Sequence, residues 1–259
     1  FFGEYIPPNK DKLKFISNFS GSYGLALILK NKNYLFVDGR YTLQAKIQSG
    51  KFFQIMTIPH KFPSDILKNK RLKIGFDPKL HTQKTLKIFF NKTNCKLVSI
   101  NQNLIDKLWV KKENNSLKKF YILPKKVVGQ NYRIKINKLI NVLKNKKVDF
   151  QFITASENIA WLLNIRGKDS NFTPIPNSYL AVGIDKKIYF FCDLKKINRS
   201  LKMKFKKIIF IDIKNTDLFL SKIKSKKILI DSSSCSIYFE NILKKNNKIA
   251  GSSDPIYLL

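Results

Sequence analysis

The stretch that decides the fold starts at Phe19 as FSGSYG, runs through an apolar segment, and ends at Leu35–Gln44 as LFVDGRYTLQ. The apolar segments Gly24–Leu29 and Tyr34–Val37 are separated by a short polar run, which predicts two strands joined by a turn. The second strand ends at an Asp-Gly pair. We therefore expect Arg40 to project from the exposed end of a strand, where a rigid scaffold presents ligand-contacting side chains.

Strands alternating with short helices extend this pattern through residues 1–112, which we interpret as a first domain. Leu43 and Ile47 lie four residues apart and give the first helix its apolar pair, with Gly50 as its C-terminal stop. Ser64 is the expected N-cap of the next helix. The remaining expected strands are 53–58, 72–76 and 95–100, and the remaining helix is 82–92.

Residues 113–120 are rich in lysine and asparagine and predict a linker, and 121–250 predict a second domain of the same α/β class. Its first helix, 131–145, has Ile134, Leu139, Val142 and Leu143 along one stripe. The sequence TASE at Thr154–Glu157 fits a capping box that starts another helix. Further expected elements are strands 150–153, 179–183, 187–192, 208–211 and 227–230, and helices near 216–224 and 235–244. The two regions share an order of elements that suggests a degenerate duplication.

The net charge of +33 suggests nucleic acid or another anionic partner, but the kind of charge argues against a specific one. Of the 50 basic residues only five are arginine, the residue that planar phosphate and base recognition favours. We expect no specific nucleic-acid partner. No apolar run is long enough for a membrane helix, so we expect no membrane partner either. The three cysteines form no CxxC pair and predict free thiols in a reducing cytoplasm.

Few residues could carry chemistry within this chain. His60 and His81 have no metal-ligand spacing, and neither a nucleophile elbow nor a phosphate loop occurs. We therefore expect no catalytic residue, no metal ligand and no cofactor here. Arg40 stands out in a lysine-rich chain, because a guanidinium can make bidentate contacts that lysine cannot. A local pairing with Asp38 is the structural alternative, and Arg166 is open to a similar pair of interpretations.

Several ordered motifs resemble the N-terminal part of the longer, three-domain Xaa-Pro aminopeptidases. They are EYIPP at 4–8, FSGSYG at 19–24, VDGRYTLQA at 37–45, IGFDP at 74–78, NLIDKLW at 103–109 and TASENIAWLLNIRG at 154–167. The resemblance covers essentially the whole chain. It implies two creatinase-like α/β domains, each a mixed central sheet flanked by helices. The chain departs from the family pattern at Asn18, Tyr23 and Lys168, which affects loop detail.

What the resemblance implies about function follows from that architecture. The parent protein is expected to be a cytoplasmic metallopeptidase that removes the first residue of peptides with proline in second position. Its divalent metal pair, expected to be manganese, and its homodimer contacts belong to a third, pita-bread domain that is absent here; residues 251–259 look like the start of the connection to it. The first strand and helix before Glu4 are absent too, so we expect a truncated fragment that is inactive alone. Of the family's functional residues only the substrate-binding arginine carries over, onto Arg40.

Two other functions remain open at this point. The same two domains could form a stand-alone, non-catalytic binding module, or the chain could be a basic nucleic-acid-binding protein. The coding sequence downstream of Leu259 distinguishes the first alternative from a peptidase, since only a peptidase requires spaced Asp, Asp, His, Glu and Glu ligands there.

Overall fold

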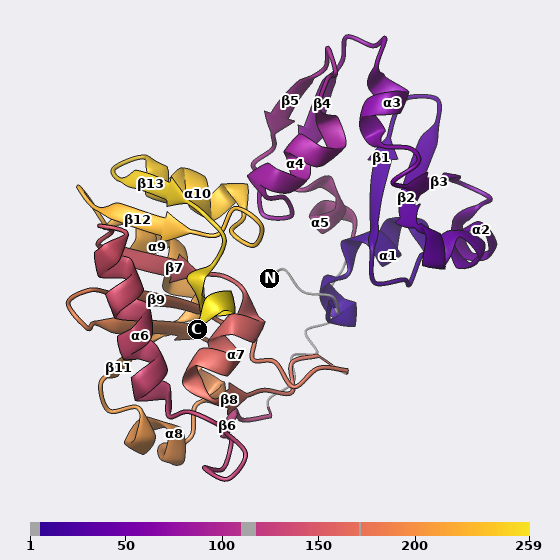
Figure 1. Cartoon of the computed structure of the whole chain (residues 1–259). Helices are drawn as coiled ribbons and strands as arrows, with labels where there is room; N and C mark the ends of the chain where they lie inside the picture. Colours follow the sequence, from indigo (N-terminus) through magenta and orange to yellow (C-terminus); the bar gives the residue numbers. More distant parts are fainter. Residues whose placement is uncertain (1–5, 110–117, 171) are drawn as a thin grey trace. The chain divides into compact units, whose positions relative to one another are not determined.

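The computed structural model describes residues 6–109, 118–170 and 172–259. The chain divides into two compact units, Glu4–Asn114 and Asn115–Leu259, called here the N-terminal and the C-terminal unit (Figure 1). The predicted linker at 113–120 lies mostly outside the described residues. Within the described ranges, no helix combines the length and the apolar character needed to cross a bilayer.

The N-terminal unit has two small sheets and five α-helices among its described residues. β1, β2 and β3 form one sheet, in which β2 pairs antiparallel with β1 and parallel with β3, and β4 pairs parallel with β5 in the other. The elements are η1 Pro8–Lys10, α1 Lys12–Ser17, β1 Gly24–Ile28, β2 Asn33–Asp38, η2 Gly39–Tyr41, α2 Thr42–Ser49, β3 Gln54–Ile58, α3 Pro63–Leu67, β4 Lys73–Phe76, α4 Gln83–Phe90, β5 Lys96–Ser99 and α5 Leu104–Leu108.

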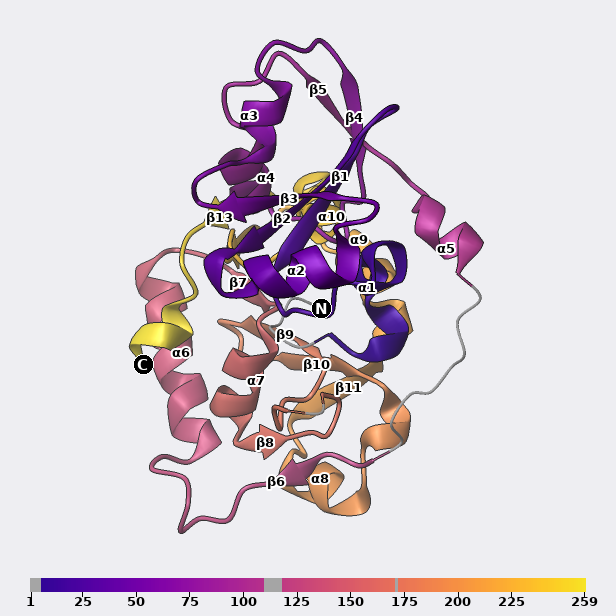
Figure 2. The ribbon, with the colours of Figure 1, turned by 90° about the vertical axis from the view of Figure 1, so that its right-hand side faces the viewer.

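Strand β2 lies at the centre of the hydrophobic core of the N-terminal unit, because its side chains are buried on both faces of the sheet. Leu35 and Val37 pack with Phe19 and with Ala45 of α2 on one side of the strand. Helix α2 lies beside β2 and β3 (Figure 2). Phe36 points to the other side and packs with Leu27 and Leu67. All three β2 side chains are fully buried, and each such burial stabilises the fold by about 1.5–3 kcal/mol. The end of β2, at Asp38, is therefore fixed rigidly in space.

Two local predictions in this unit are wrong. Leu43 and Ile47 are 72% and 77% exposed, and α2 instead turns Ala45 and Ser49 to the sheet. Small side chains allow the helix backbone to approach the strands closely. Ser64 does not cap α3, because the helix starts one residue earlier at Pro63, and the Asp65 carboxylate accepts a hydrogen bond from the Phe62 N–H at 2.7 Å.

The C-terminal unit is built on a six-stranded mixed sheet of order β11-β10-β9-β7-β12-β13. β7, β12 and β13 are mutually parallel, whereas β9 runs antiparallel to both of its neighbours. The elements are β6 Tyr121–Ile122, α6 Tyr132–Asn145, β7 Phe150–Ile153, α7 Ser156–Leu163, β8 Ile165–Arg166, β9 Tyr179–Gly183, β10 Ile188–Cys192, η3 Leu194–Lys196, α8 Arg199–Lys204, β11 Ile208–Asp212, η4 Ile213–Asn215, α9 Thr216–Ser221, β12 Lys227–Ile230, α10 Ile237–Lys244, β13 Lys248–Gly251 and η5 Pro255–Leu258.

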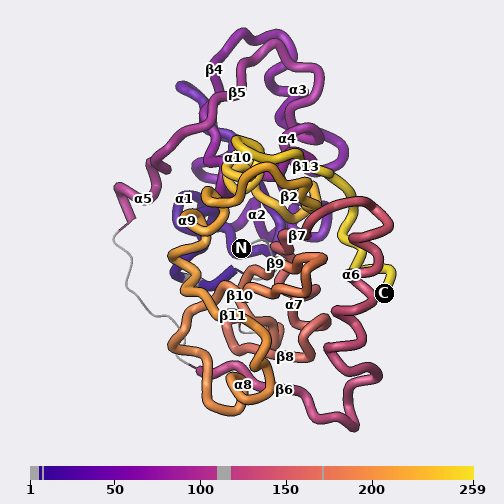
Figure 3. Tube along the Cα trace, turned by 90° about the vertical axis from the view of Figure 1, so that its left-hand side faces the viewer, coloured from indigo at the N-terminus to yellow at the C-terminus, as the bar shows by residue number. Residues whose placement is uncertain are grey.

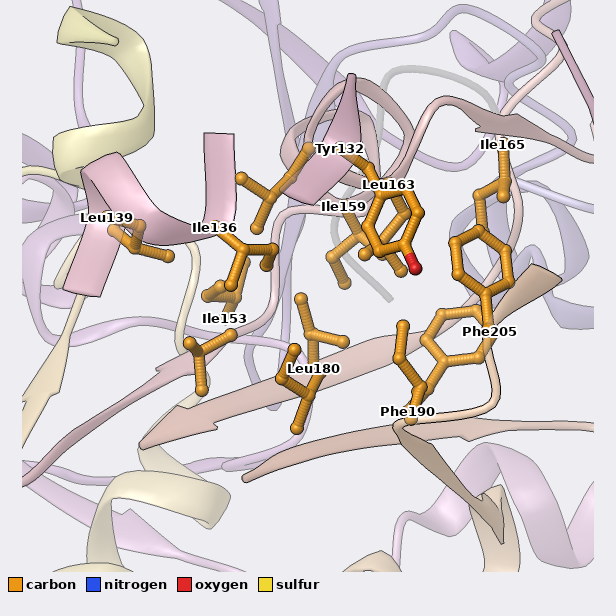
Figure 4. Close-up of a cluster of buried hydrophobic side chains, with 14 of the residues drawn as sticks. Tyr132, Ile136, Leu139, Ile153, Ile159, Leu163, Ile165, Leu180, Phe190 and Phe205 are labelled. Atoms are coloured by element: carbon orange, nitrogen blue, oxygen red, sulfur yellow. The ribbon is translucent and has the colours of Figure 1, made fainter. Parts of the chain in front are cut away.

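Helices cover both faces of this sheet. α6 and α7 lie on one face and α9 and α10 on the other (Figures 1 and 3). The first face holds the larger apolar cluster, in which side chains of α6 converge with those of β9 and β10 (Figure 4). Leu139, Leu180 and Phe190 at its centre are no more than 1% exposed. The mixed α/β architecture predicted from the sequence is confirmed.

Four details of the C-terminal unit differ from the sequence prediction. The capping box does not form, since the Thr154 hydroxyl hydrogen-bonds Ser234 at 2.9 Å and α7 starts at Ser156. On α6, Ile134 is 51% exposed whereas Lys135 is 4% exposed. Trp161 lies within an apolar stretch of α7 but is 37% exposed. Strands β6, β8 and β13 and helix α8 have no counterpart among the predicted elements.

Candidate functional site

Arg40 lies directly beyond the carboxyl end of β2, on the short 3-10 helix η2. The Asp38 carboxylate caps η2 by accepting the Arg40 backbone N–H at 2.9 Å. This cap reverses the chain between strand and helix and turns the Arg40 side chain outward, where it is 71% exposed. The prediction that Arg40 lies at the exposed end of its strand is confirmed.

The guanidinium of Arg40 also pairs with Asp38. Its Nη2 lies 2.7 Å from Oδ2 and its Nε lies 3.2 Å from Oδ1 of the carboxylate. The hydrogen bond from Arg40 is the main cause that lowers the pKa of Asp38 below its usual value. The local pairing that the sequence left open as an alternative is therefore present, and it coexists with exposure of the guanidinium.

Aromatic side chains line the surroundings of this pair. The Arg40 guanidinium carbon lies 5.3 Å from the ring centre of Tyr41, and the Tyr41 hydroxyl is 2.8 Å from that of Ser22. Tyr23 is 45% exposed, and its pKa is raised first by burial and then by the negative charge of Asp38. The two tyrosines, Ser22, Asp38 and Arg40 form what we call the Arg40 group.

Hydrogen bonds hold the turn that leads from Ser20 to Ser22 and Tyr23 against α2. The Gln48 side-chain oxygen accepts from the Ser20 N–H at 3.0 Å, and Gln44 donates to the Ser20 hydroxyl at 3.0 Å. Gly21 faces the ring of Phe19 so closely that a Cβ atom there would collide with it. Gly39 is different, since no atom lies within 4 Å of a Cβ placed there and its φ is not positive. The turn that projects Arg40 therefore does not require a glycine.

Arg166, the other arginine that the sequence singles out, has a structural role. It donates from Nη1 to the carbonyls of Ala160 and Ile165 at 3.0 and 2.8 Å, which anchors the end of α7.

The histidines and cysteines are the remaining residues that could bind a metal. His60 is exposed, and His81 packs edge-on against Phe76, with its pKa lowered by burial. The three cysteines are free thiols. Within the described ranges, no three His, Cys, Asp or Glu side chains gather as metal ligands would, so these residues do not fit a metal centre.

One polar cluster in the C-terminal unit has no signal in the sequence. Lys135 is buried, and its Nζ donates at 2.6 Å to both the Trp161 carbonyl and the Asn164 side chain. Burial, followed by the positive charge of Arg166, lowers the pKa of Lys135 to about 8. Asn164 itself adopts a left-handed conformation at the end of α7. Lysine and arginine together thus satisfy the terminal carbonyls of this helix.

Two family models match nearly all of the chain. Residues 111–259 match one described as the creatinase/prolidase N-terminal domain, and residues 5–108 match another with the same description. The chain belongs to the creatinase/prolidase N-terminal domain family. This confirms the resemblance seen in the sequence motifs, and two units of this family stand in tandem.

Known members of this family show how much of a longer protein the chain resembles. It is 30% identical over 206 residues to Aminopeptidase P1 of Lotus japonicus and 33% identical over 198 residues to a probable Xaa-Pro aminopeptidase P of Laccaria bicolor. These matches cover 77% and 72% of the chain but only 31% of each relative. The chain thus spans about a third of the length of these curated relatives.

A solved relative extends the comparison to the fold. The X-prolyl aminopeptidase of Caenorhabditis elegans, described as a cytosolic enzyme with a di-nuclear active site, matches with a TM-score of 0.84 and 25% identity. The match covers 96% of this chain and 44% of that one. The fold of this chain is therefore found in an experimentally determined aminopeptidase.

Proposed function

We propose that this chain is the non-catalytic N-terminal portion of a cytoplasmic Xaa-Pro aminopeptidase, and that Arg40 helps to bind the peptide substrate. The family assignment and the aminopeptidase relatives support the peptidase role. In this proposal the substrate is a peptide with proline in second position. The hydrolytic metal pair, expected to be manganese, and the homodimer interface belong to a part of the protein beyond these two units.

The observation that carries the role of Arg40 is its exposed but held guanidinium. Asp38 fixes the backbone and one side of the guanidinium, while 71% of the side chain faces solvent. A guanidinium has five N–H donors in a planar fork, which suits a peptide carbonyl or carboxylate. Because Asp38 already restricts the side chain, less conformational entropy is lost when a peptide binds. The Arg40 group would in this way help to limit which peptides reach the hydrolytic centre.

The test requires the full-length protein encoded at this locus, purified with added manganese. We expect it to cleave Xaa-Pro peptides and the 259-residue chain alone to show no turnover. Arg40→Lys should lower kcat/KM by about 10- to 100-fold, the scale of a lost charge-assisted hydrogen bond. Arg133→Lys is the matched control. Arg133 lies on α6 of the C-terminal unit, where its Nε donates to the Tyr132 hydroxyl.

The outcomes separate the two parts of the proposal. A full-length protein that fails to cleave any Xaa-Pro peptide contradicts the peptidase role and favours a stand-alone binding module. If the wild type cleaves and Arg40→Lys cleaves equally well with its fold intact, the peptidase role stands and the substrate-binding role of Arg40 is wrong.

A further inference from the structure

Helix α2 exposes its larger apolar side chains to solvent. Because Ala45 and Ser49 face the sheet, Leu43 and Ile47 lie together on the outer side of the helix, one turn apart, and each is more than 70% exposed. Single exposed apolar side chains are common on folded proteins, whereas adjacent ones mark surfaces that bind something. The outer side of α2 is therefore a candidate interaction surface.

Two more apolar side chains extend this surface. Ile28, at the end of β1, is 59% exposed and lies on the same side of the sheet as α2, because Ala26 two residues earlier packs into the cluster beneath that helix. Phe52, which follows α2, is 66% exposed, and its carbonyl accepts a hydrogen bond at 3.4 Å from Asn33, the residue that pairs with the end of β1. We define the α2 face as Ile28, Leu43, Ile47 and Phe52.

The α2 face is surrounded by positive charge. Between residues 12 and 64 the chain has eight basic residues and one acidic residue, Asp38, whose carboxylate is already paired. The Nζ atom of Lys51 lies 5.5 Å from the centre of the Phe52 ring, and Lys46 is on the exposed side of α2. Within the described ranges, no carboxylate lies within ion-pair distance of Lys30, Lys32, Lys46 or Lys51. The partner that fits this face is therefore both anionic and apolar.

Three kinds of anionic macromolecule differ in how well they suit these residues. The bases of nucleic acids stack on aromatic rings and are read by arginine, whereas three of the four side chains of the α2 face are aliphatic. Protein interfaces are enriched in arginine and depleted of lysine, and the cations around this face are lysines. At the surface of a bilayer, aliphatic side chains enter the acyl boundary while lysine stems extend to the headgroups. The α2 face and its lysines therefore fit an anionic lipid surface best.

We propose that the α2 face is a site of peripheral adsorption to anionic lipid membranes. Leu43, Ile47 and Phe52 enter the interface, and the surrounding lysines bind the lipid headgroups. The net charge of +33 attracts the whole chain to such a surface. We expected no membrane partner from the sequence because no apolar run can span a bilayer, whereas adsorption to its surface requires no spanning helix. The site concerns the N-terminal unit alone and does not depend on the peptidase role.

Vesicle sedimentation of the 259-residue chain tests the site. At low salt the chain should bind vesicles of phosphatidylcholine and phosphatidylglycerol in equal parts, bind pure phosphatidylcholine vesicles weakly, and dissociate as the salt concentration is raised. A chain that fails to bind the anionic vesicles overturns the proposal. The α2 face then requires another occupant, such as an acidic polypeptide.

Two double variants separate the site from the general attraction of a basic chain. Leu43→Ser with Ile47→Ser keeps the net charge and should lower the affinity for anionic vesicles by about 10-fold or more, because two aliphatic side chains no longer enter the interface. Ile209→Ser with Leu218→Ser changes two exposed aliphatic residues of the C-terminal unit and should keep the wild-type affinity. Equal affinities of the two double variants contradict the proposal.

A second pair of variants tests the lysines and leaves the apolar residues in place. Lys46→Gln with Lys51→Gln should weaken binding more than Lys144→Gln with Lys146→Gln, which removes the same charge at exposed positions at the end of α6. Circular dichroism and the unfolding midpoint establish that each variant is folded. Equal losses in the two pairs would mean that net charge alone attracts the chain, and the α2 face would not be a binding site.

Discussion

The carboxylate of Asp38 holds the guanidinium of Arg40 two residues later in the chain, yet 71% of the Arg40 side chain remains exposed to solvent. The pair stands at the end of β2, whose apolar residues are fully buried on both faces. A rigid strand, a capped turn and a charge pair together restrict where the guanidinium can point. A lysine at this position could not keep the same two-pronged contact, because its ammonium is a point charge on a flexible stem.

Replacing Asp38 by Asn should loosen Arg40 and also change Tyr23. Asparagine keeps an acceptor for the Arg40 N–H but removes the negative charge that faces the Tyr23 phenol. Because that charge helps to raise the pKa of Tyr23, the pKa should fall in Asp38→Asn. Titration of Tyr23 by NMR measures this shift. Asp185→Asn is the control, and an unaltered Tyr23 titration in Asp38→Asn would mean that the two side chains do not face each other in solution.

Two glycines of the Arg40 region should respond oppositely to alanine. Gly21→Ala drives a methyl group into the buried Phe19 ring and should destabilise the N-terminal unit by about 1–3 kcal/mol. Gly39→Ala meets open space at an ordinary backbone conformation, so it should be neutral or stabilise by up to about 1 kcal/mol. Denaturant unfolding measures both. Equal losses in the two variants would contradict this account of the turns.

The strands could be predicted from the sequence because the apolar side chains that they bury are neighbours in the sequence. Leu35, Phe36 and Val37 are apolar in succession, as expected of a strand buried on both faces. The polar run at 30–33 precedes the strand, and Asp38 and Gly39 follow it. Which side chains of a short helix are buried is harder to predict. In α2 the spacing of Leu43 and Ile47 imitates a core stripe, while the helix buries Ala45 and Ser49.

Long-range polar contacts could not be predicted from the sequence at all. The burial of Lys135 depends on carbonyl and amide oxygens of Trp161 and Asn164, which come from a different helix. The exposed position of Arg40 could be predicted, because a polar turn that follows a buried strand directs the next side chain to solvent. In the structure the Asp38 carboxylate caps this turn, and the glycine is not required.

Lys135 should make the stability of the C-terminal unit rise at alkaline pH. Its pKa is about 8 when folded and about 10.5 when unfolded, so the unfolded chain holds more protons between these values. The free energy of unfolding should therefore increase from pH 8 to pH 10.5 relative to Lys135→Met, with a constant difference below pH 7. Denaturation midpoints at pH 7, 8.5 and 10 measure it. Lys144→Met, at an exposed position on α6, should follow the wild type, and parallel curves for Lys135→Met and wild type would refute the assignment.

The loop that follows Arg166 should depend on one buried ion pair. Lys196 of η3 pairs with Asp169, whose side chain is 2% exposed and also accepts the Asn177 N–H at 2.7 Å. Lys196→Met would leave that carboxylate buried without a cation, which typically costs about 3–5 kcal/mol. Lys187→Met breaks a pair whose side chains are more than half exposed, and it should cost no more than about 1 kcal/mol.

A double variant separates the lost charge from lost packing around Lys196. Asp169→Asn combined with Lys196→Met removes both charges and keeps an acceptor for Asn177, so it should regain most of the stability lost in Lys196→Met. Denaturant unfolding of the single and double variants gives the coupling energy. If the double variant is as unstable as Lys196→Met alone, the loss comes from the packing of the lysine stem against its neighbours. The buried carboxylate would then not be what makes Lys196 necessary.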